Sequence, residues 1–243
     1  MVDRRTSRIP LLNTLAQAPM RLEGQFVWGS NYTFLARLEG EAGQILAVYK
    51  PSRGEQPLWD FPAGTLAARE VAAYLTSQAL GWDLVPPTVW RVDAPAGPGS
   101  VQLYVEADPD RHYFTFSGDE KARLGPVVIF DAVVNNADRK AGHVLLGADD
   151  HLWLIDHGVC FHVEDKLRTV IWDFAGEAIP EALLVGLRDL RRRLKGDERL
   201  RAAFAALLSA EEIAALERRA DRLTASGRFP LPGQERPYPW PLV

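Results

Sequence analysis

The sequence lacks several features that define large protein classes. Among 243 residues it has one cysteine, Cys160, which excludes an intramolecular disulfide and fits a reducing compartment. No apolar run reaches the ~20 residues of a membrane helix, and the basic N-terminus has no continuous apolar core of a signal peptide. A net charge of −4 provides no general attraction to nucleic acid or to an anionic membrane. We therefore expect a cytoplasmic protein without nucleic-acid partners or transmembrane segments.

The most informative stretch of the chain runs from Ile129 to His162. A helical pattern over residues 126–135 leads into a polar loop with Asp138, and two short apolar segments then end at Asp156. A loop and a hairpin in this order can bring two carboxylates into one cleft. Phosphoryl transfer needs one such group to orient the nucleophile and another to hold the metal on the phosphates. The alternative is an acidic loop beside a β-turn, because Asp, Asn and Gly are common turn residues.

Two motifs in this stretch resemble the catalytic core of phosphatidylinositol 3- and 4-kinases. The first is Asp131-x-x-x-x-Asn136-x-Asp138-Arg139, and the second is Leu154-Ile155-Asp156-His157-Gly158-Val159-x-Phe161. The resemblance is strongest to the type II phosphatidylinositol 4-kinases and extends to small bacterial kinase-like proteins of the same superfamily. It is specific within this stretch and looser over the rest of the chain.

The resemblance implies a role for each matching residue. Asp138 would accept or orient the proton of the attacking hydroxyl, and Asp156 would bind the divalent metal. Lys50, which ends an apolar strand, would contact the nucleotide phosphates while paired with Glu70 of the following helix. Two roles stay open for Arg139: stabilising developing charge during catalysis, or bracing the loop through an ion pair.

The sequence departs from this family at His143, five residues after Asp138, where these kinases carry a metal-binding asparagine. Magnesium prefers oxygen ligands, whereas imidazole suits Mn²⁺ or Zn²⁺ better. The implied cofactors are therefore ATP with Mg²⁺ or Mn²⁺. The histidine predicts reliance on one metal, a preference for Mn²⁺, or lost activity. Structural hydrogen bonding is the alternative for His143, and it is the favoured interpretation for His157.

A separate interpretation of the same region is a zinc site. Its candidate ligands are Asp156, His157, Cys160 and His162. Strand alternation would spread these side chains over two faces, and no second ligand pair occurs elsewhere in the chain. The sequence therefore disfavours zinc.

The N-terminal half predicts an antiparallel sheet and one long helix. Residues 1–19 are expected to form a loosely held arm. Strand patterns cover residues 20–23, 32–38, 45–50, 88–92 and 101–106, and a helix covers 65–80. In the turn after Gly24, Ser30 and Asn31 are candidates for covering phosphates, although an ordinary hairpin explains them equally well. Tyr104 and Val105 fall where a kinase chain crosses between lobes and its backbone binds adenine.

The C-terminal half predicts helices over residues 180–194, 197–208 and 209–225. A basic run from Arg188 to Arg201 is interleaved with acidic residues, which indicates either a salt-bridged solvated face or a docking face for an acidic partner. Residues 229–243 contain five prolines and are expected to follow the surface as an extended tail.

These patterns together predict an α+β fold. We expect one bilobal protein-kinase-like domain, with an antiparallel-sheet N-lobe at about 20–106, a mainly helical C-lobe at about 107–228 and the tail at 229–243. The leading function is ATP-dependent phosphate transfer to a hydroxyl of a lipid headgroup, polyol or protein. The alternatives are a nucleotide-binding pseudokinase with a regulatory or scaffold role, and a structural interaction protein.

Overall fold

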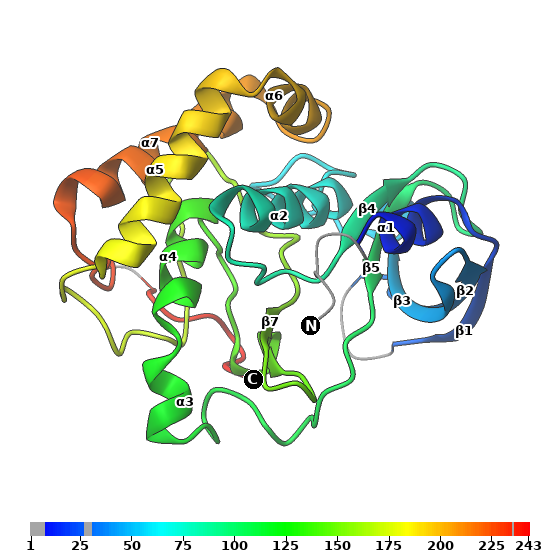
Figure 1. Ribbon diagram of the computed structural model, residues 1–243, viewed down its shortest axis with the longest axis horizontal. Coiled ribbons are helices and arrows are strands. Elements are labelled where there is room, and N and C mark those ends of the chain that lie inside the picture. The colour runs from blue at the N-terminus through cyan, green and yellow to red at the C-terminus, as the bar shows by residue number, and fades with distance from the viewer. Residues whose placement is uncertain (1–7, 27–30, 235) are drawn as a thin grey trace.

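A five-stranded antiparallel sheet forms one side of the molecule (Figure 1). The computed structural model describes residues 8–26, 31–234 and 236–243. The strands lie in the order β1-β2-β3-β5-β4. They are β1 (Met20–Gln25), β2 (Phe34–Gly40), β3 (Gly43–Pro51), β4 (Thr88–Arg91) and β5 (Gly99–Leu103). Alternate residues of β2 and β3, among them Leu38 and Tyr49, are fully buried, so one face of the sheet needs an apolar cover.

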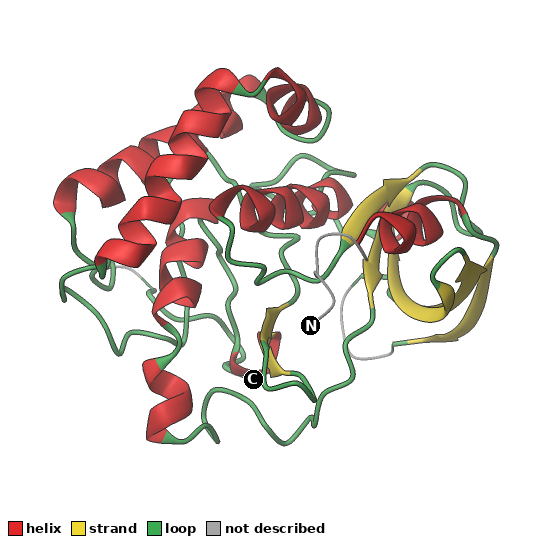
Figure 2. Cartoon of the chain, viewed as in Figure 1, coloured by secondary structure: helices red, strands yellow, loops and turns green. Residues whose placement is uncertain are grey.

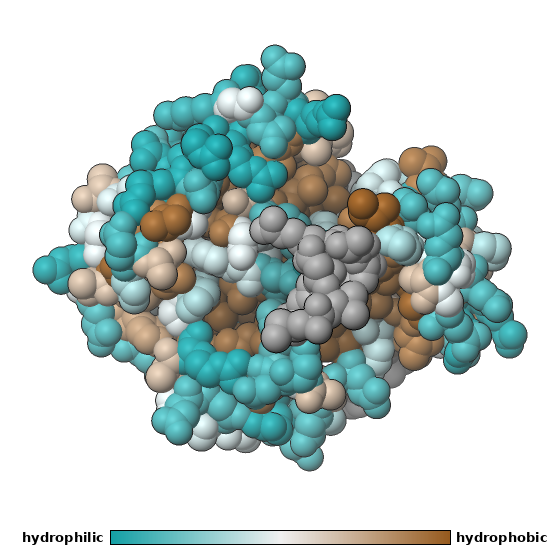
Figure 3. All heavy atoms as spheres, in the orientation of Figure 1, coloured by the Kyte–Doolittle hydropathy of each residue, from teal (hydrophilic) through white to brown (hydrophobic). Residues whose placement is uncertain are grey.

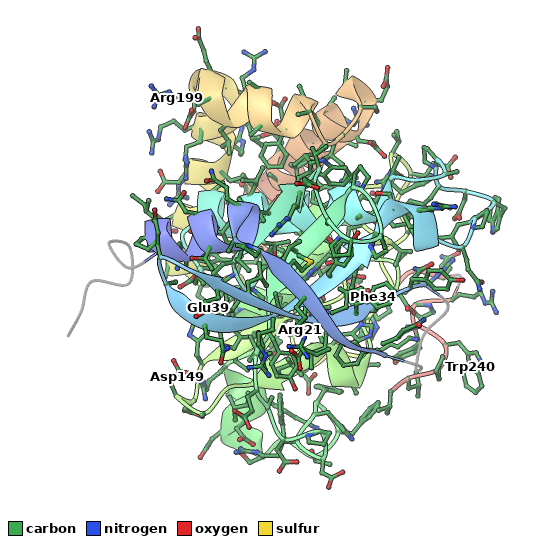
Figure 4. The ribbon with its side chains drawn as sticks, turned by 90° about the vertical axis from the view of Figure 1, so that its right-hand side faces the viewer. Arg21, Phe34, Glu39, Asp149, Arg199 and Trp240 are labelled. Atoms are coloured by element: carbon green, nitrogen blue, oxygen red, sulfur yellow. The ribbon has the colours of Figure 1, made fainter. Side chains whose placement is uncertain are left out.

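Helix α1 (Arg8–Gln17) supplies that cover, lying against the sheet beside β4 (Figures 1 and 4). Leu15 is fully buried among the inward side chains of β2, β3 and β5. The hydroxyl of Thr14 accepts a hydrogen bond from the Ala42 backbone N at 3.0 Å. The expectation of a loosely held N-terminal arm is therefore wrong over residues 8–17, because the sheet buries this helix.

Helix α2 (Leu66–Leu80) joins the sheet to the helical part of the molecule. It contacts β4 and β5 on one side and α4, α5 and α6 on the other. Gly81 ends the helix with φ of 74°, in the left-handed conformation that glycine adopts without steric cost. Because α2 is enclosed from both sides, even Arg69 and Glu70 are buried.

The remaining chain forms the helical part, shown mostly in red in Figure 2. Its elements are α3 (Gly118–Ala122), α4 (Gly125–Val134), the hairpin of β6 (Val144–Leu146) and β7 (Leu152–Leu154), α5 (Glu181–Gly196), α6 (Glu198–Ala205) and α7 (Ala210–Ser226). Helix α4 is apolar on all sides and is buried almost completely, including Ile129 and Phe130, as expected of a central helix. The α+β class and the division into a sheet part and a mainly helical part are thus confirmed.

The basic run lies on the outer surface of α5 and α6, where hydrophilic residues predominate in Figure 3 and Arg199 lies at the surface in Figure 4. Arg192 pairs with Asp189 at 3.1 Å, and Arg193 pairs with Asp197 at 3.6 Å. Arg191 bonds to Asp221 of α7. These contacts are those of a salt-bridged solvated face, and they give no support to docking of an acidic partner there.

The C-terminal tail follows the surface of the helical part in an extended path. The carbonyl of Pro237 accepts a hydrogen bond from Thr169 N at 3.1 Å, and that of Leu242 accepts one from Ala141 N at 2.8 Å. Trp240 between them remains 85% exposed (Figure 4). The tail is therefore held by its backbone beside the loop that follows Asp138. Within the described part of the chain, no helix combines the length and apolar character needed to cross a membrane.

Candidate active site

A cavity of about 830 Å³ opens between the sheet and the helical part, within the range of small-molecule and cofactor sites. Segments distant in sequence form its walls: β3, α2, the chain after β5, the loop after α4 and the residue after β7. Eight of the residues predicted for the site line it, namely Asn31, Lys50, Glu70, Tyr104, Val105, Asp138, His143 and Asp156. The structure therefore brings most of the predicted site together.

Lys50 projects into this cavity from the end of β3. Its Nζ bonds to Oε1 of Glu70 and lies 3.1 Å from Oδ1 of Asp156. Burial disfavours the charged ammonium, but Asp156 and Glu70 outweigh it and raise the pKa of Lys50. Gly99 of β5 makes this packing possible, since a Cβ there would lie 2.2 Å from the carbonyl oxygen of Lys50. Lys50 is thus a fixed cation between two carboxylates.

Asp156 lies two residues after the end of β7 and has the left-handed conformation, with φ of 61°, which turns the chain sharply after the strand. Its Oδ2 lies 3.4 Å from Nε2 of His143. The charge of Lys50 holds the pKa of Asp156 well below its usual range. Burial lowers the pKa of His143 to about 4, although Asp156 opposes this. At neutral pH the pair therefore presents a carboxylate and a neutral imidazole, both able to bind a cation.

Asp138 faces the same cavity from the loop after α4. Its backbone N donates to Oδ1 of Asn136 at 2.9 Å, and Asn136 Nδ2 donates to Asp131 at 3.1 Å, so the loop shape is fixed from behind. Nζ of Lys140 lies 3.4 Å from the Asp138 carboxylate. Lys140 lines the cavity but was missed by the sequence analysis, although its position two residues after Asp138 was the available signal.

The environment of Asp138 can be tested by the pH dependence of protein stability, without an activity assay. Burial raises this pKa to about 6, with Lys140 opposing. The folded protein then binds a proton there more tightly than the unfolded chain, so Asp138 lowers stability as pH rises from about 4 to about 6. We expect Asp138→Asn to raise the melting temperature relative to wild type more at pH 7 than at pH 4, without ligands. Thermal unfolding across this range measures it, and an equal difference at both pH values would contradict it.

Arg139 does not line the cavity. Its guanidinium is fully buried and pairs with Asp131, with Nε 2.9 Å from Oδ2 and Nη2 2.9 Å from Oδ1. Nη1 also donates to the backbone carbonyls of His143 at 3.1 Å and Ile155 at 2.8 Å. Of the two predicted roles, this placement favours bracing the loop, because the guanidinium donors point into the protein.

The outer wall of the cavity contains the remaining predicted nucleotide contacts. Asn31 Oδ1 accepts a hydrogen bond from Gln56 N at 2.7 Å, so its side chain ties two loops together. Tyr104 N donates to the Leu46 carbonyl at 3.0 Å, which leaves the chain beyond it, at Val105, to face the cavity. Ser30 lies outside the described residues.

The loop between β3 and α2 covers one side of the cavity, at Glu55 and Leu58. Glu55 accepts hydrogen bonds from the first two backbone N–H groups of α2, at 3.0 and 2.8 Å. Asp60 pairs with Lys166 of the helical part at 3.0 Å. At the base of this loop, Arg69 Nη1 donates to the carbonyl of the buried Cys160 at 2.6 Å. The loop therefore links the two halves of the molecule beside the cavity.

The donor set of the site fits one divalent cation shared with phosphates. Asp156 is half-exposed, with 51% of its side chain accessible, and His143 lies beside it. No cluster of three His, Cys, Asp or Glu ligands occurs in residues 8–26, 31–234 and 236–243, so the zinc interpretation finds no support. A carboxylate and an imidazole would hold a metal only with oxygens from a ligand, and this pair suits Mn²⁺ better than Mg²⁺.

A mycobacterial protein is related to this chain in sequence. The chain is 40% identical to protein Rv2133c of Mycobacterium tuberculosis (strain ATCC 25618 / H37Rv), over 93% of both proteins. The chain belongs to the Rv2133c family. No protein-family model matches it.

Several solved structures share this fold, and the kinases among them confirm that the fold is kinase-like. The Golgi casein kinase with Mn/ADP bound aligns over 92% of this chain and 76% of its own, with a TM-score of 0.58 and 15% identity. Hydra Fam20 with sugar aligns over 93% and 89%, with a TM-score of 0.57 and 14% identity. The Helicobacter pylori proinflammatory kinase CtkA aligns over 88% and 94%, with a TM-score of 0.55 and 11% identity. At these identities the likeness concerns the fold.

Proposed function

We propose that this protein is an ATP-dependent phosphotransferase that delivers a phosphoryl group to a hydroxyl acceptor. The observation that supports it best is the meeting of Lys50, Asp138 and Asp156 in one cavity, although 106 residues separate Lys50 from Asp156. A phosphate-binding cation, a base for the nucleophile and a metal-binding carboxylate are the parts that phosphoryl transfer requires. The kinase-like fold agrees with this assignment.

Each side chain has a distinct task in this mechanism. Lys50, fixed by Glu70, would bind the α- and β-phosphates from the sheet side. Asp138 would accept the proton of the acceptor hydroxyl, and its raised pKa of about 6 suits a base that works near neutral pH. Lys140 would meet the developing charge on the transferred phosphoryl group. The backbone of Tyr104 and Val105 would bind the adenine.

The divalent cation would be held by Asp156 and His143 together with phosphate oxygens. When bound, it neutralises charge on the phosphates. The phosphatidylinositol 3-/4-kinase-like placement of the chain remains part of this proposal, since it depends on the motifs around Asp138 and Asp156. The acceptor class is left open among lipid headgroups, polyols and protein hydroxyls, because fold does not fix the acceptor.

Nucleotide binding tests this proposal first. ATP with Mn²⁺ or Mg²⁺ is expected to raise the melting temperature, because a ligand that binds only the folded state stabilises it. Lys50→Ala is expected to remove most of this shift, whereas Lys195→Ala, an exposed change on α5, is expected to keep it. Thermal unfolding with and without ATP and metal measures both. Absence of any ATP effect on the wild type would contradict the proposal and favour the interaction-protein alternative.

His143 decides between an active kinase and a nucleotide-binding pseudokinase. We expect phosphate transfer by the wild type to be faster with Mn²⁺ than with Mg²⁺. We expect His143→Asn to shift the ratio of the two rates toward Mg²⁺ by about tenfold, because replacing one group at a metal site typically changes metal affinity by about that factor. Turnover assays with each metal measure the ratio. Equal rates with both metals, unchanged by His143→Asn, would remove His143 from the metal site. ATP stabilisation without turnover under any metal would identify a pseudokinase.

A further inference from the structure

His157 occupies the centre of a buried polar chain between the two halves of the site. Its side chain is fully buried behind Asp156. Its backbone N donates to Oε2 of Glu70 at 2.9 Å. Its ring nitrogen Nε2 lies 2.9 Å from Nη2 of Arg139, and Nδ1 lies 3.6 Å from Oε2 of Glu70. One residue therefore contacts both α2 and the loop of Asp138.

The hydrogen-bond roles of this imidazole follow from its neighbours. A guanidinium only donates, so Nε2 of His157 must accept from Arg139 and carry no proton. The proton of the neutral ring then lies on Nδ1, directed at the Glu70 carboxylate. The 3.6 Å separation is longer than a hydrogen bond, so Nδ1 faces the Glu70 carboxylate without bonding to it. The ring thus lies between a buried cation and a buried anion.

The chain continues from both sides of His157 to the reacting groups. On one side, Glu70 bonds to Lys50. On the other, Arg139 pairs with Asp131 at 2.9 Å, Asp131 accepts from Asn136 at 3.1 Å, and Asn136 accepts from the Asp138 backbone at 2.9 Å. Lys50 and Asp138 are therefore joined through His157, whose backbone N bonds to Glu70 and whose ring bonds to Arg139.

Packing alone does not explain a histidine at this position. The ring packs edge-on against Phe130, with centroids 5.6 Å apart, and a phenylalanine would keep that contact. Buried polar groups cost stability unless they are hydrogen-bonded, and both nitrogens here face charged groups. The hydrogen bond from Arg139 to Nε2 is therefore a contact that packing alone does not require.

We propose that His157 is a positioning residue that couples the Lys50–Glu70 pair to the loop carrying Asp138. The inference rests on the proposed function. It assigns no contact between His157 and substrate. Its effect is geometric: the ring holds the separation between the group that binds the phosphates and the group that receives the acceptor proton, and small displacements of such groups reduce rates strongly.

Three variants test this coupling by steady-state kinetics. His157→Phe keeps the ring packing and loses both polar contacts, so kcat should fall about 10- to 100-fold while KM for ATP changes less than about threefold. His157→Gln has an amide NH₂ that can donate and an amide oxygen that can accept, and should recover part of kcat. His151→Phe, at a histidine outside the cavity, should leave kcat unchanged. Wild-type kcat in His157→Phe, or equal losses in Phe and Gln variants, would overturn the proposal.

A double-mutant cycle separates coupling from a general loss of stability. Glu70→Gln, His157→Phe and the double variant are compared by urea midpoint, and contacting residues are expected to be non-additive. If the shift in urea midpoint of the double variant equals the sum of the two single shifts, the inference is overturned, even if His157→Phe has a low kcat. Failure of the proposed function is recognised differently, because the wild type itself would then transfer no phosphate. A wild type that transfers phosphate and a His157→Phe variant of equal rate would defeat only the inference about His157.

Discussion

Replacing Asp138 with asparagine is expected to slow phosphate transfer by about 10²- to 10⁴-fold, the usual contribution of a positioned general base. The carboxylate faces the cavity, whereas its backbone is fixed by Asn136. An amide of the same shape keeps this loop geometry but accepts no proton at neutral pH. ATP binding should be nearly unchanged, because the phosphates are bound by Lys50 and the metal.

The measurement compares ATP turnover with ATP-dependent thermal stabilisation in the same preparation. Asp119→Asn on the exposed surface of α3 is the matched control, since it makes the same chemical change away from the cavity. A loss of turnover with retained stabilisation identifies Asp138 as the base. If Asp138→Asn turns over ATP at the wild-type rate, the assignment of the base is wrong.

Removing either partner of the Arg139–Asp131 pair is expected to cost about 3–5 kcal/mol of unfolding free energy, because an uncompensated charge stays buried. Both side chains are almost completely inaccessible, at 0% and 2%. Domains of this kind are stable by only about 5–15 kcal/mol, so Arg139→Ala or Asp131→Ala should unfold at much lower urea. The effect of the Asp131→Leu, Arg139→Met double variant should be smaller than the summed single effects.

Urea unfolding at constant pH measures these costs, with Arg192→Ala on the exposed face of α5 as the control. Arg192 also pairs with an aspartate, but at the surface, where such pairs contribute about 0–1 kcal/mol. A variant of Arg139 that unfolds like the wild type but has lost turnover would contradict the bracing role. That result would instead support the other predicted role of Arg139, stabilising developing charge during catalysis.

Much of the site was predictable because its residues lie at the ends of regular elements. The lysine at the end of β3 and the glutamate in α2 followed from strand and helix patterns together with the kinase resemblance. Boundaries were predictable where a glycine ends a helix, as at Gly81 and Gly227. The spacing of Ser209 and Glu212 is likewise that of a capping box, and the structure contains this box.

Other features depended on contacts that no local pattern encodes. Helix α1 has only a weak amphipathic pattern in the sequence, and its stability comes from burial of Leu15 against the sheet. The short helix α3 is determined by the capping box of Ser117, which the sequence analysis did not use. The two-sided contact of His157 joins residues 87 and 18 positions away, and such separations are invisible without tertiary structure.

The lone thiol gives the protein an internal reporter of opening. Cys160 is fully buried in the core beside Arg69 of α2, and burial raises its pKa well above the ordinary value. A thiolate reacts far faster than a thiol, so alkylating reagents should meet this atom only when the two halves separate or the chain unfolds. The rate of alkylation therefore measures how often Cys160 becomes accessible, through separation of the two halves or through unfolding, without any added label.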